Sequence, residues 1–160
     1  MSLPLFRETV RPEWIDYNGH MSEAYYVLVF GFATDALMER TGLDSTYRKR
    51  TGCSLYTVEA HVRYLRDVPE GAQLAVHTRV LGAAGKKARF AHEMYVVEGP
   101  RAEPDPVATT ELLALHVDQG AGRAVPFPPE VRERLAALAE EPPGWAGRSI
   151  DPVVTTPGGR

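Results

Sequence analysis

The sequence contains a single cysteine, Cys53, so no disulfide can form within the chain. The first residues, MSLPLFRETV, also lack the charged and then apolar pattern of a secretion signal. We therefore expect a cytoplasmic protein. No base accompanies Cys53 in the sequence, so we interpret it as a buried or inert thiol.

Long apolar runs and clusters of basic charge are missing as well. The longest apolar run, residues 24–33 (AYYVLVFGFA), is shorter than the roughly 20 residues that span a bilayer, and Asp35 follows it closely. The net charge is −3 and the basic residues are scattered, which argues against a nucleic-acid surface. With 44% hydrophobic and 24% charged residues, the chain is expected to be a soluble globular protein without a membrane or nucleic-acid partner.

The apolar run belongs to a predicted central helix. Ser22 is a plausible N-cap and Gly42 a C-terminal stop, which gives a helix of about five turns after a short strand at residues 5–10. The first half of this helix is apolar nearly all round, so we expect other elements to wrap it. The residues spaced to form one face are Tyr26, Val27, Phe30, Ala33 and Leu37.

After Gly52 the apolar period changes to two, which is typical of half-buried strands. In SLYTVEAHVRYL, residues 54–65, the residues expected to face the core are Tyr56, Val58, Ala60, Val62 and Tyr64, and those expected to face away are Thr57, Glu59, His61 and Arg63. Further strands are predicted at residues 73–81, 88–97 and 107–117, following one another as an antiparallel meander.

A short helix at residues 127–141 completes the predicted fold, with prolines at its start. The pattern indicates an α+β class, in which one antiparallel sheet curls around the central helix. We expect residues 1–141 to form a single domain. Residues 142–160, rich in proline and glycine, are expected to form a flexible tail or an arm across a neighbour.

One polar stretch, PEWIDYNGHM, stands directly before the central helix and places Asp16 near its start. The N–H groups at a helix start are unpaired and attract negative charge, including an oxyanion that develops on a carbonyl. A carboxylate displaced by the tight turn that Asn18 and Gly19 permit would face such a carbonyl as nucleophile or general base. Spacing alone slightly favours a purely structural turn, because these residue types are common in turns.

The run D-x-N-G-H-M from Asp16 to Met21, the aromatic-rich helix, VEAHVRYLRDVPEG and HVD resemble the acyl-CoA thioesterases of the hotdog fold, the 4-hydroxybenzoyl-CoA thioesterase-like group. The resemblance in element order covers residues 5–140. Within the group, EWIDYNGHMSEAYYV and PFPPEV are most similar to betainyl-CoA thioesterases and to the thioesterase domain fused to some carnitine dehydrogenases. The resemblance implies hydrolysis of a small or medium acyl-CoA to the free acid and CoA without a cofactor, by a homodimer or homotetramer.

The resemblance also assigns roles within the motif. Asp16 corresponds to the catalytic carboxylate, and the backbone N–H near Glu23 corresponds to the group that polarises the thioester carbonyl. Gly19 gives the backbone room beside the substrate, and Met21 completes the motif. Asn18 and His20 are expected to position Asp16 or the attacking water. His20 is alternatively a second general base, since imidazole titrates near neutral pH.

Further candidates come from the aromatic and charged residues around the motif. A quaternary ammonium in the acyl group would be attracted by an aromatic cage, although such rings more often serve packing. The cage candidates are Trp14, Tyr17, Tyr25, Tyr26 and Tyr56. Glu59 and His61 are expected on a polar strand face, from which they would reach the site across a dimer.

Basic residues at strand ends are candidates for holding the CoA phosphates, although such side chains are usually just solvated. They are Arg63, Arg66, Lys86, Lys87 and Arg89. His61, His77, His92 and His116 recur along the strands without the spacing of a metal site, so no metal is expected.

Two other function classes stay open at this point. One is a hotdog enoyl-CoA hydratase or dehydratase, whose different catalytic pattern is absent from the sequence. The other is a binding module that keeps the acyl-CoA pocket without chemistry, against which the intact Asp16 speaks. Water addition to an enoyl-CoA would favour the first, and acyl-CoA binding without CoA release the second.

Overall fold

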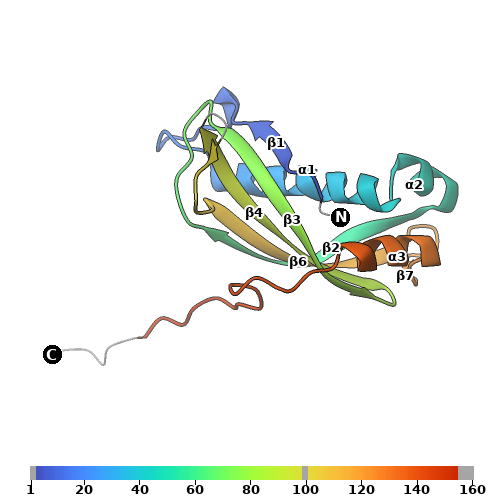
Figure 1. Cartoon of the computed structure of the whole chain (residues 1–160). Helices are drawn as coiled ribbons and strands as arrows, with labels where there is room; N and C mark the ends of the chain where they lie inside the picture. The colour runs from blue at the N-terminus through green and yellow to red at the C-terminus, as the bar shows by residue number, and fades with distance from the viewer. Residues whose placement is uncertain (1–2, 99–100, 155–160) are drawn as a thin grey trace.

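The computed structural model describes residues 3–98 and 101–154, in which one curled antiparallel sheet lies against the long helix α1 (Glu23–Thr41) (Figure 1). The strands along the main path of the sheet are β1 (Phe6–Thr9), β3 (Gln73–Ala84), β4 (Lys87–Glu98), β6 (Ala108–Asp118) and β2 (Cys53–Tyr64), in this spatial order. Two short strands, β5 (Arg101–Ala102) and β7 (Arg123–Ala124), pair with β4 and β6. The predicted α+β class, with a sheet wrapped around a central helix, is confirmed.

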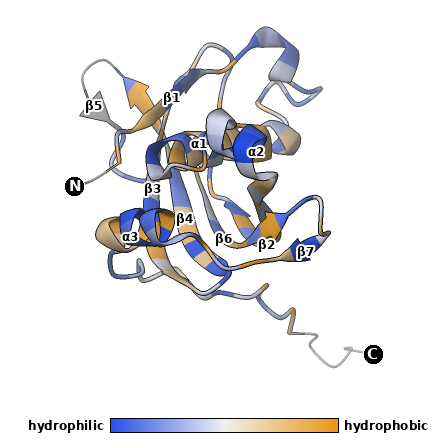
Figure 2. Cartoon of the chain, turned by 90° about the vertical axis from the view of Figure 1, so that its right-hand side faces the viewer, coloured by the Kyte–Doolittle hydropathy of each residue, from blue (hydrophilic) through white to orange (hydrophobic). Residues whose placement is uncertain are grey.

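Helix α1 begins and ends where the sequence predicts. Ser22 is the N-cap, and Gly42 ends the helix in a left-handed conformation with φ 88°, donating its N–H to the Met38 carbonyl. One side of the helix packs into the concave face of the sheet (Figure 2). The buried side chains on this side include Tyr26, Val29, Phe30, Ala33 and Leu37.

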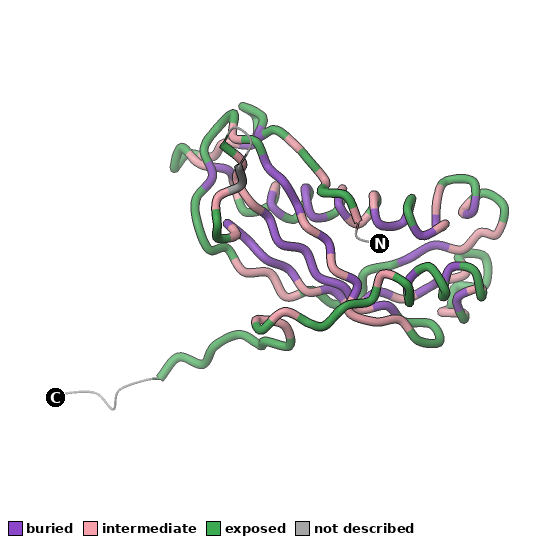
Figure 3. The backbone as a smooth tube through the Cα atoms, in the orientation of Figure 1, coloured by how far each residue is buried: buried purple, intermediate pink, exposed green. Residues whose placement is uncertain are grey.

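The expectation that α1 is wrapped on all sides is wrong for the single chain. Val27 is 49% exposed and Leu28 39% exposed, because the one sheet covers only one side of the helix. Figure 3 shows the same division, with buried residues on the sides of helix and sheet that face each other. Among the described residues, no helix is long and apolar enough to cross a membrane.

The predicted meander holds only in part, because β2 pairs with β6 and not with β3. The segment between β2 and β3, residues 65–72, is therefore a crossover from one edge region of the sheet to the other. It is well anchored: the Leu65 N–H donates to the Val107 carbonyl (2.8 Å), and Val68 is fully buried in the core. The sequence RDVPEGA supplies turn residues for this crossover where a meander would need a hairpin.

Strand β2 also differs from its predicted facing. A bulge between Thr57 and Glu59 shifts the register against β6, so the two halves of the strand turn opposite sets of residues toward α1. Leu55 before the bulge and Val62 after it both pack in the core. Tyr56 and Val58, expected in the core, are instead 42% and 53% exposed.

Among the helices, two were not predicted and one is shorter than expected. A 3-10 turn, η1 (Pro12–Trp14), precedes the polar stretch. Helix α2 (Ser45–Thr51) is capped by Asp44, whose carboxylate accepts from the Tyr47 N–H (2.8 Å). Helix α3 (Pro129–Leu138) lies within the range predicted from its prolines and apolar face, and covers the far end of the core with Val131 and Leu135.

The chain after α3 runs against the outer face of the sheet, which points away from α1. Glu140 donates its N–H to the Val80 carbonyl (2.9 Å), and its carboxylate accepts from Arg79 (2.6 Å). Further on, the Gly147 N–H donates to the Glu111 carboxylate (2.6 Å). Residues 149–154 are exposed. The predicted tail extends to residues 155–160, which lie outside the described residues, and its flexibility stays a prediction.

A fully buried histidine, His92, joins α1 to the sheet. The Thr34 hydroxyl on α1 donates to the Phe30 carbonyl (3.1 Å) and lies 2.9 Å from His92 Nε2. Since the Thr34 hydroxyl proton is donated to the Phe30 carbonyl, the Thr34 oxygen accepts from Nε2–H of His92. On the other side of the ring, Nδ1 accepts from the Thr78 hydroxyl (2.8 Å). Burial lowers the His92 pKa from 6.5 to about 3, which keeps the imidazole neutral and fits this pattern of hydrogen bonds.

This buried imidazole predicts a pH-dependent stability. Below pH 6.5 the unfolded chain is protonated at His92, whereas the folded chain is protonated there only near pH 3. The free energy of unfolding therefore decreases as the pH is lowered through this window. We expect a loss of about 1–2 kcal/mol between pH 7.5 and pH 5, above the range where most carboxylates titrate. Urea unfolding of the His92→Gln variant should give a flatter profile over this interval, and an unchanged slope would contradict the assignment.

Candidate active site

The predicted turn around Asp16 is present, and the Asp16 carboxylate is part of it. The Asp16 N–H donates to the His20 carbonyl (3.0 Å), and the Gly19 N–H donates back to the Asp16 carbonyl (3.0 Å). Gly19 has φ 81°, a conformation that glycine adopts without strain. The Asp16 Oδ1 atom accepts from the Asn18 N–H (2.8 Å), so this side chain fixes the turn with one oxygen.

The turn is held firmly against α1 from two sides. The Ser22 N–H donates to the Trp14 carbonyl (2.9 Å), and the Met21 N–H donates to the Val68 carbonyl of the crossover (2.8 Å). Trp14 is buried and stacks on Tyr25 in the first turns of α1, with ring centroids 5.5 Å apart. These contacts fix the carboxylate relative to the start of the helix.

The start of α1 offers hydrogen-bond donors next to Asp16. The first N–H groups of a helix have no partner within it, and the Ser22 side chain makes no capping hydrogen bond here. Asp16 itself is half-buried, and among the described residues no cation lies within 4.0 Å of its carboxylate. Asp16 thus carries no ion pair among the described residues, and its turn leads directly into the uncapped start of α1.

A cleft of about 740 Å³ opens beside this helix start, between α1 and the crossover. Its lining residues are Met21, Glu23, Tyr26, Tyr64, Leu65, Arg66 and Asp67. Four of them come from the motif, the first turns of α1 and the end of β2, and the other three come from the crossover, which is far from the motif in sequence. The cleft therefore exists because the crossover passes the start of the helix.

Two tyrosines form the inner part of the cleft. Tyr26 is buried and donates its hydroxyl to the Arg66 carbonyl (3.0 Å), and the Tyr64 ring meets it edge to face with centroids 5.3 Å apart. Burial, together with the negative charge of Asp67 and then smaller effects of Tyr64 and Asp16, raises the pKa of Tyr26 to about 12. Burial and the Glu23 carboxylate raise the pKa of Tyr64. In both cases burial is the largest cause, and the neighbouring carboxylates add to it.

The structure brings together only part of the predicted aromatic cage. Tyr26 lines the cleft, whereas Trp14 and Tyr25 stack on each other and serve packing. Tyr17 is 97% exposed, and Tyr56 lies on the outer face, where its hydroxyl accepts from Gln119 (2.7 Å). Of the other motif residues, Met21 lines the cleft and Asn18 is exposed. The His20 ring approaches Asp67, with 3.9 Å from Nδ1 to Oδ2.

Glu59 and His61 lie apart from the Asp16 cleft within one chain. They share a second, smaller pocket of about 230 Å³ on the outer face of the sheet with Arg89, Glu111 and Arg148. Arg89 donates to the Glu111 carboxylate (3.1 Å), and Arg63 is on the same face. Lys86 and Lys87 lie at the turn between β3 and β4. Of the predicted CoA-binding residues, only Arg66 lines the cleft.

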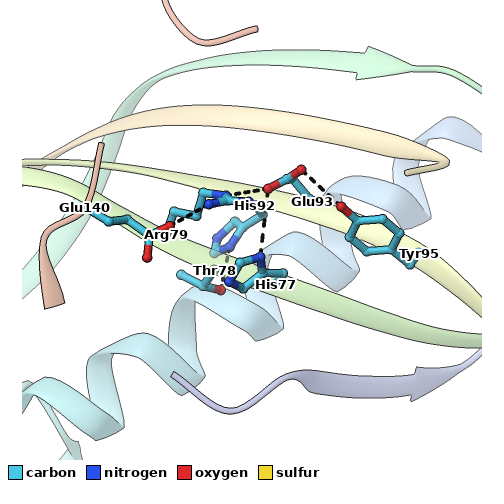
Figure 4. A network of polar contacts seen from close by, with 7 residues as sticks. All are labelled: His77, Thr78, Arg79, His92, Glu93, Tyr95 and Glu140. Atoms are coloured by element: carbon cyan, nitrogen blue, oxygen red, sulfur yellow. Dashed lines mark hydrogen bonds and ion pairs between the residues drawn. The ribbon is translucent and has the colours of Figure 1, made fainter. Parts of the chain in front are cut away.

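In a second polar cluster on the outer face, the charged side chains pair with one another (Figure 4). Glu93 is buried and accepts from Arg79 Nε (2.5 Å) and from the Tyr95 hydroxyl (3.1 Å), with His77 3.9 Å away. Burial and the Glu93 carboxylate raise the pKa of Tyr95 to about 12. This cluster lies across the sheet from α1, and its charges hold strands β3 and β4 and the chain after α3 together.

Sequence reasoning missed Tyr64, Leu65 and Asp67 as site residues. The sequence places Tyr64 on the core face of a predicted strand, Leu65 at the end of that strand, and Asp67 in a turn. No local signal could have found them, since their role follows from the path of the crossover. Among residues 3–98 and 101–154, no group of three or more His, Cys, Asp or Glu side chains is arranged to hold a metal ion.

Comparison with known sequences gives a consistent picture. The family model of the thioesterase-like superfamily matches residues 10–135. The betainyl-CoA thioesterase of Pseudomonas aeruginosa is 44% identical over 138 residues, which cover 86% of this chain and 84% of that protein. The L-carnitine dehydrogenase/betainyl-CoA thioesterase of Agrobacterium fabrum is 44% identical over 152 residues, which cover 92% of this chain but 30% of that longer protein.

Solved structures agree with the sequence matches. A candidate thioesterase from Pseudomonas putida superposes with a TM-score of 0.78 at 34% identity, covering 96% of this chain and 99% of that one. A Staphylococcus aureus protein in complex with CoA reaches a TM-score of 0.83 at 23% identity, with 96% and 98% covered, and supports the fold alone. The sheet curled around α1 is the hotdog fold, and the chain belongs to the thioesterase-like superfamily as a thioester hydrolase.

Proposed function

We propose that this hydrolase cleaves an acyl-CoA thioester with a small acyl group, betainyl-CoA, to betaine and CoA, without a cofactor. The observation that carries the proposal is the Asp16 carboxylate, oriented by its own turn in the segment that leads directly into the uncapped start of α1. The names and the 44% identity of the two betainyl-CoA thioesterase relatives support the choice of acyl group. A cytoplasmic location stays a prediction.

In the proposed reaction the thioester carbonyl oxygen accepts a hydrogen bond from the N–H at the first turn of α1, near Glu23. The helix dipole and this N–H stabilise the negative charge that develops on the oxygen. Asp16 then acts on the carbonyl carbon from the other side, either by direct attack or by removing a proton from water. The C–S bond breaks, CoA leaves as the thiolate and takes up a proton, and water supplies the second oxygen of the acid.

Asn18 and Gly19 serve this chemistry through the backbone in the proposed mechanism. The Asn18 N–H orients one carboxylate oxygen and leaves the other, Oδ2, without a hydrogen bond from the described residues. Membership in the thioesterase-like superfamily favours hydrolysis over the two competing interpretations, a hydratase and a binding module. His20 stays a candidate for positioning the attacking water or for a second base.

The first test replaces the carboxylate while keeping the turn. In Asp16→Asn the amide oxygen still accepts from the Asn18 N–H, so the fold should survive, while the nucleophile or base is lost. We expect kcat for betainyl-CoA to fall by about 10²–10⁴. Free-thiol release measures the rate, and circular dichroism confirms folding.

Each of the other outcomes would count against the proposal. Unchanged turnover would remove Asp16 from the mechanism. Tight acyl-CoA binding by the wild type without thiol release would favour a binding module, and addition of water to an enoyl-CoA would favour a hydratase.

We further propose that the chain acts as a homodimer, or as a tetramer of such dimers, joined at the edge strand β2. This strand has one neighbour, β6, so its other edge offers unpaired backbone groups. Apolar side chains are exposed on both β2 and α1: Val58 is 53% exposed, and Val27 and Leu28 on α1 are also uncovered. A second copy would cover these surfaces. It would also cover the side of α1 that one sheet leaves exposed.

This assembly predicts an asymmetric response of the two sheet edges. Val58→Lys places a charge on the β2 edge and should shift the protein to monomers in sedimentation velocity. Leu5 is 45% exposed next to the other edge strand, β1, and Leu5→Lys is the matched control that should keep the wild-type mass. Dissociation by Leu5→Lys alone would place the interface at β1. A monomeric wild type would refute the proposed homodimer and tetramer altogether.

A further inference from the structure

The charge of the cleft at the start of α1 does not suit every part of the proposed substrate. Glu23 and Asp67 contribute two carboxylates to its lining. The one cationic side chain in the lining, Arg66, is already engaged: it donates to the Glu103 carboxylate (3.2 Å) and to the Asp105 carbonyl (3.0 Å). Such a cleft repels the phosphates of CoA and attracts a cation.

The acyl group of betainyl-CoA carries a cation at a fixed distance from the reacting carbon. Its trimethylammonium nitrogen is joined to the carbonyl carbon through one methylene, the same N–C–C geometry as in a peptide, so the two atoms are roughly 2.5 Å apart. When the carbonyl oxygen binds at the first turn of α1, the cation must therefore lie beside the same turn. Glu23 lines the cleft at this point, and Tyr26 lies less than one helical turn further on.

The two tyrosines in the cleft differ in exposure, so they have different roles in binding a cation. Tyr26 is buried and fixed by its hydrogen bond to the Arg66 carbonyl, so it holds the position of its neighbour. Tyr64 packs against it at an interplanar angle of 88° but is 46% exposed, so its ring keeps open surface toward the cleft. Aromatic rings attract quaternary ammonium groups, and tyrosine does so without a competing charge.

We propose that Tyr64, positioned by Tyr26 and flanked by the Glu23 and Asp67 carboxylates, recognises the quaternary ammonium of the acyl group and makes this thioesterase selective for a cationic substrate. This inference rests on the proposed function and adds the residues that choose the substrate. It replaces the cage expected from the sequence, of which only Tyr26 is in place.

The test compares two thioesters of the same shape, one cationic and one neutral. In 3,3-dimethylbutyryl-CoA a carbon atom replaces the ammonium nitrogen of betainyl-CoA, so shape and reacting group are kept. The measured quantity is the ratio of kcat/KM for the cationic to the neutral thioester. We expect a ratio of about ten or more for the wild type, as cation–π attraction in a partly desolvated site provides.

Variants then locate the source of the preference. Tyr64→Leu should lower the ratio about tenfold by raising KM for betainyl-CoA more than KM for the neutral thioester. Tyr64→Phe keeps the aromatic face and should keep most of the preference, so a general loss of structure at this position is distinguishable. Asp67→Asn should lower the ratio by a smaller factor, and Glu133→Gln on the exposed side of α3 is the matched carboxylate control that should leave it unchanged.

The outcomes separate this inference from the proposed function. If the wild type hydrolyses both thioesters equally well, or if Tyr64→Leu keeps the full preference, the cation site is refuted while the hydrolase stands. If the wild type releases thiol from neither thioester, the proposed function itself fails.

Discussion

Enclosure of α1 is the constraint on which the rest of the structure depends. The first half of this helix is apolar nearly all round, so water is a poor environment for it, and the sheet curves to cover one side. With β2 at one edge and β3 near the other, the chain between them has to cross the open end of the sheet. It passes the start of α1 there, where Val68 is buried and accepts the Met21 N–H. The cleft is thus a by-product of burying the helix.

Much of this architecture could be predicted from the sequence because its signals are local. The caps of α1 at Ser22 and Gly42 and the period of two along β3, β4 and β6 depend on neighbouring residues only. The partner of β2 could not be predicted, since periodicity indicates which face of a strand is buried but not which strand lies beside it. The bulge at Thr57/Glu59 inverts the facing within one strand, and no residue in SLYTVEAHVRYL announces it.

The same distinction explains which site residues could be found. Asp16, Gly19 and the helix start lie within one short motif, so their proximity follows from the chain itself. Tyr64 and Asp67 reach the cleft only through tertiary structure. Glu59, His61 and Arg89, in contrast, are candidates that the fold places away from the cleft. Their side chains lie on the outer face of the sheet, because side chains alternate between the two faces along each strand.

The hydrogen bonds of His92 to the middle of α1 have a consequence for the proposed chemistry at the start of the helix. A helix held by apolar contacts alone can slide or rotate in its groove at little cost, because such contacts have no direction. The contacts from Thr34 to His92 and from His92 to Thr78 are directional, and they permit one axial placement of α1 on the sheet. Displacing reacting groups by about 1 Å can cost about 10²-fold in rate. The buried imidazole therefore fixes the position of α1 along its own axis. It thereby sets where the first N–H groups of the helix stand in the proposed mechanism.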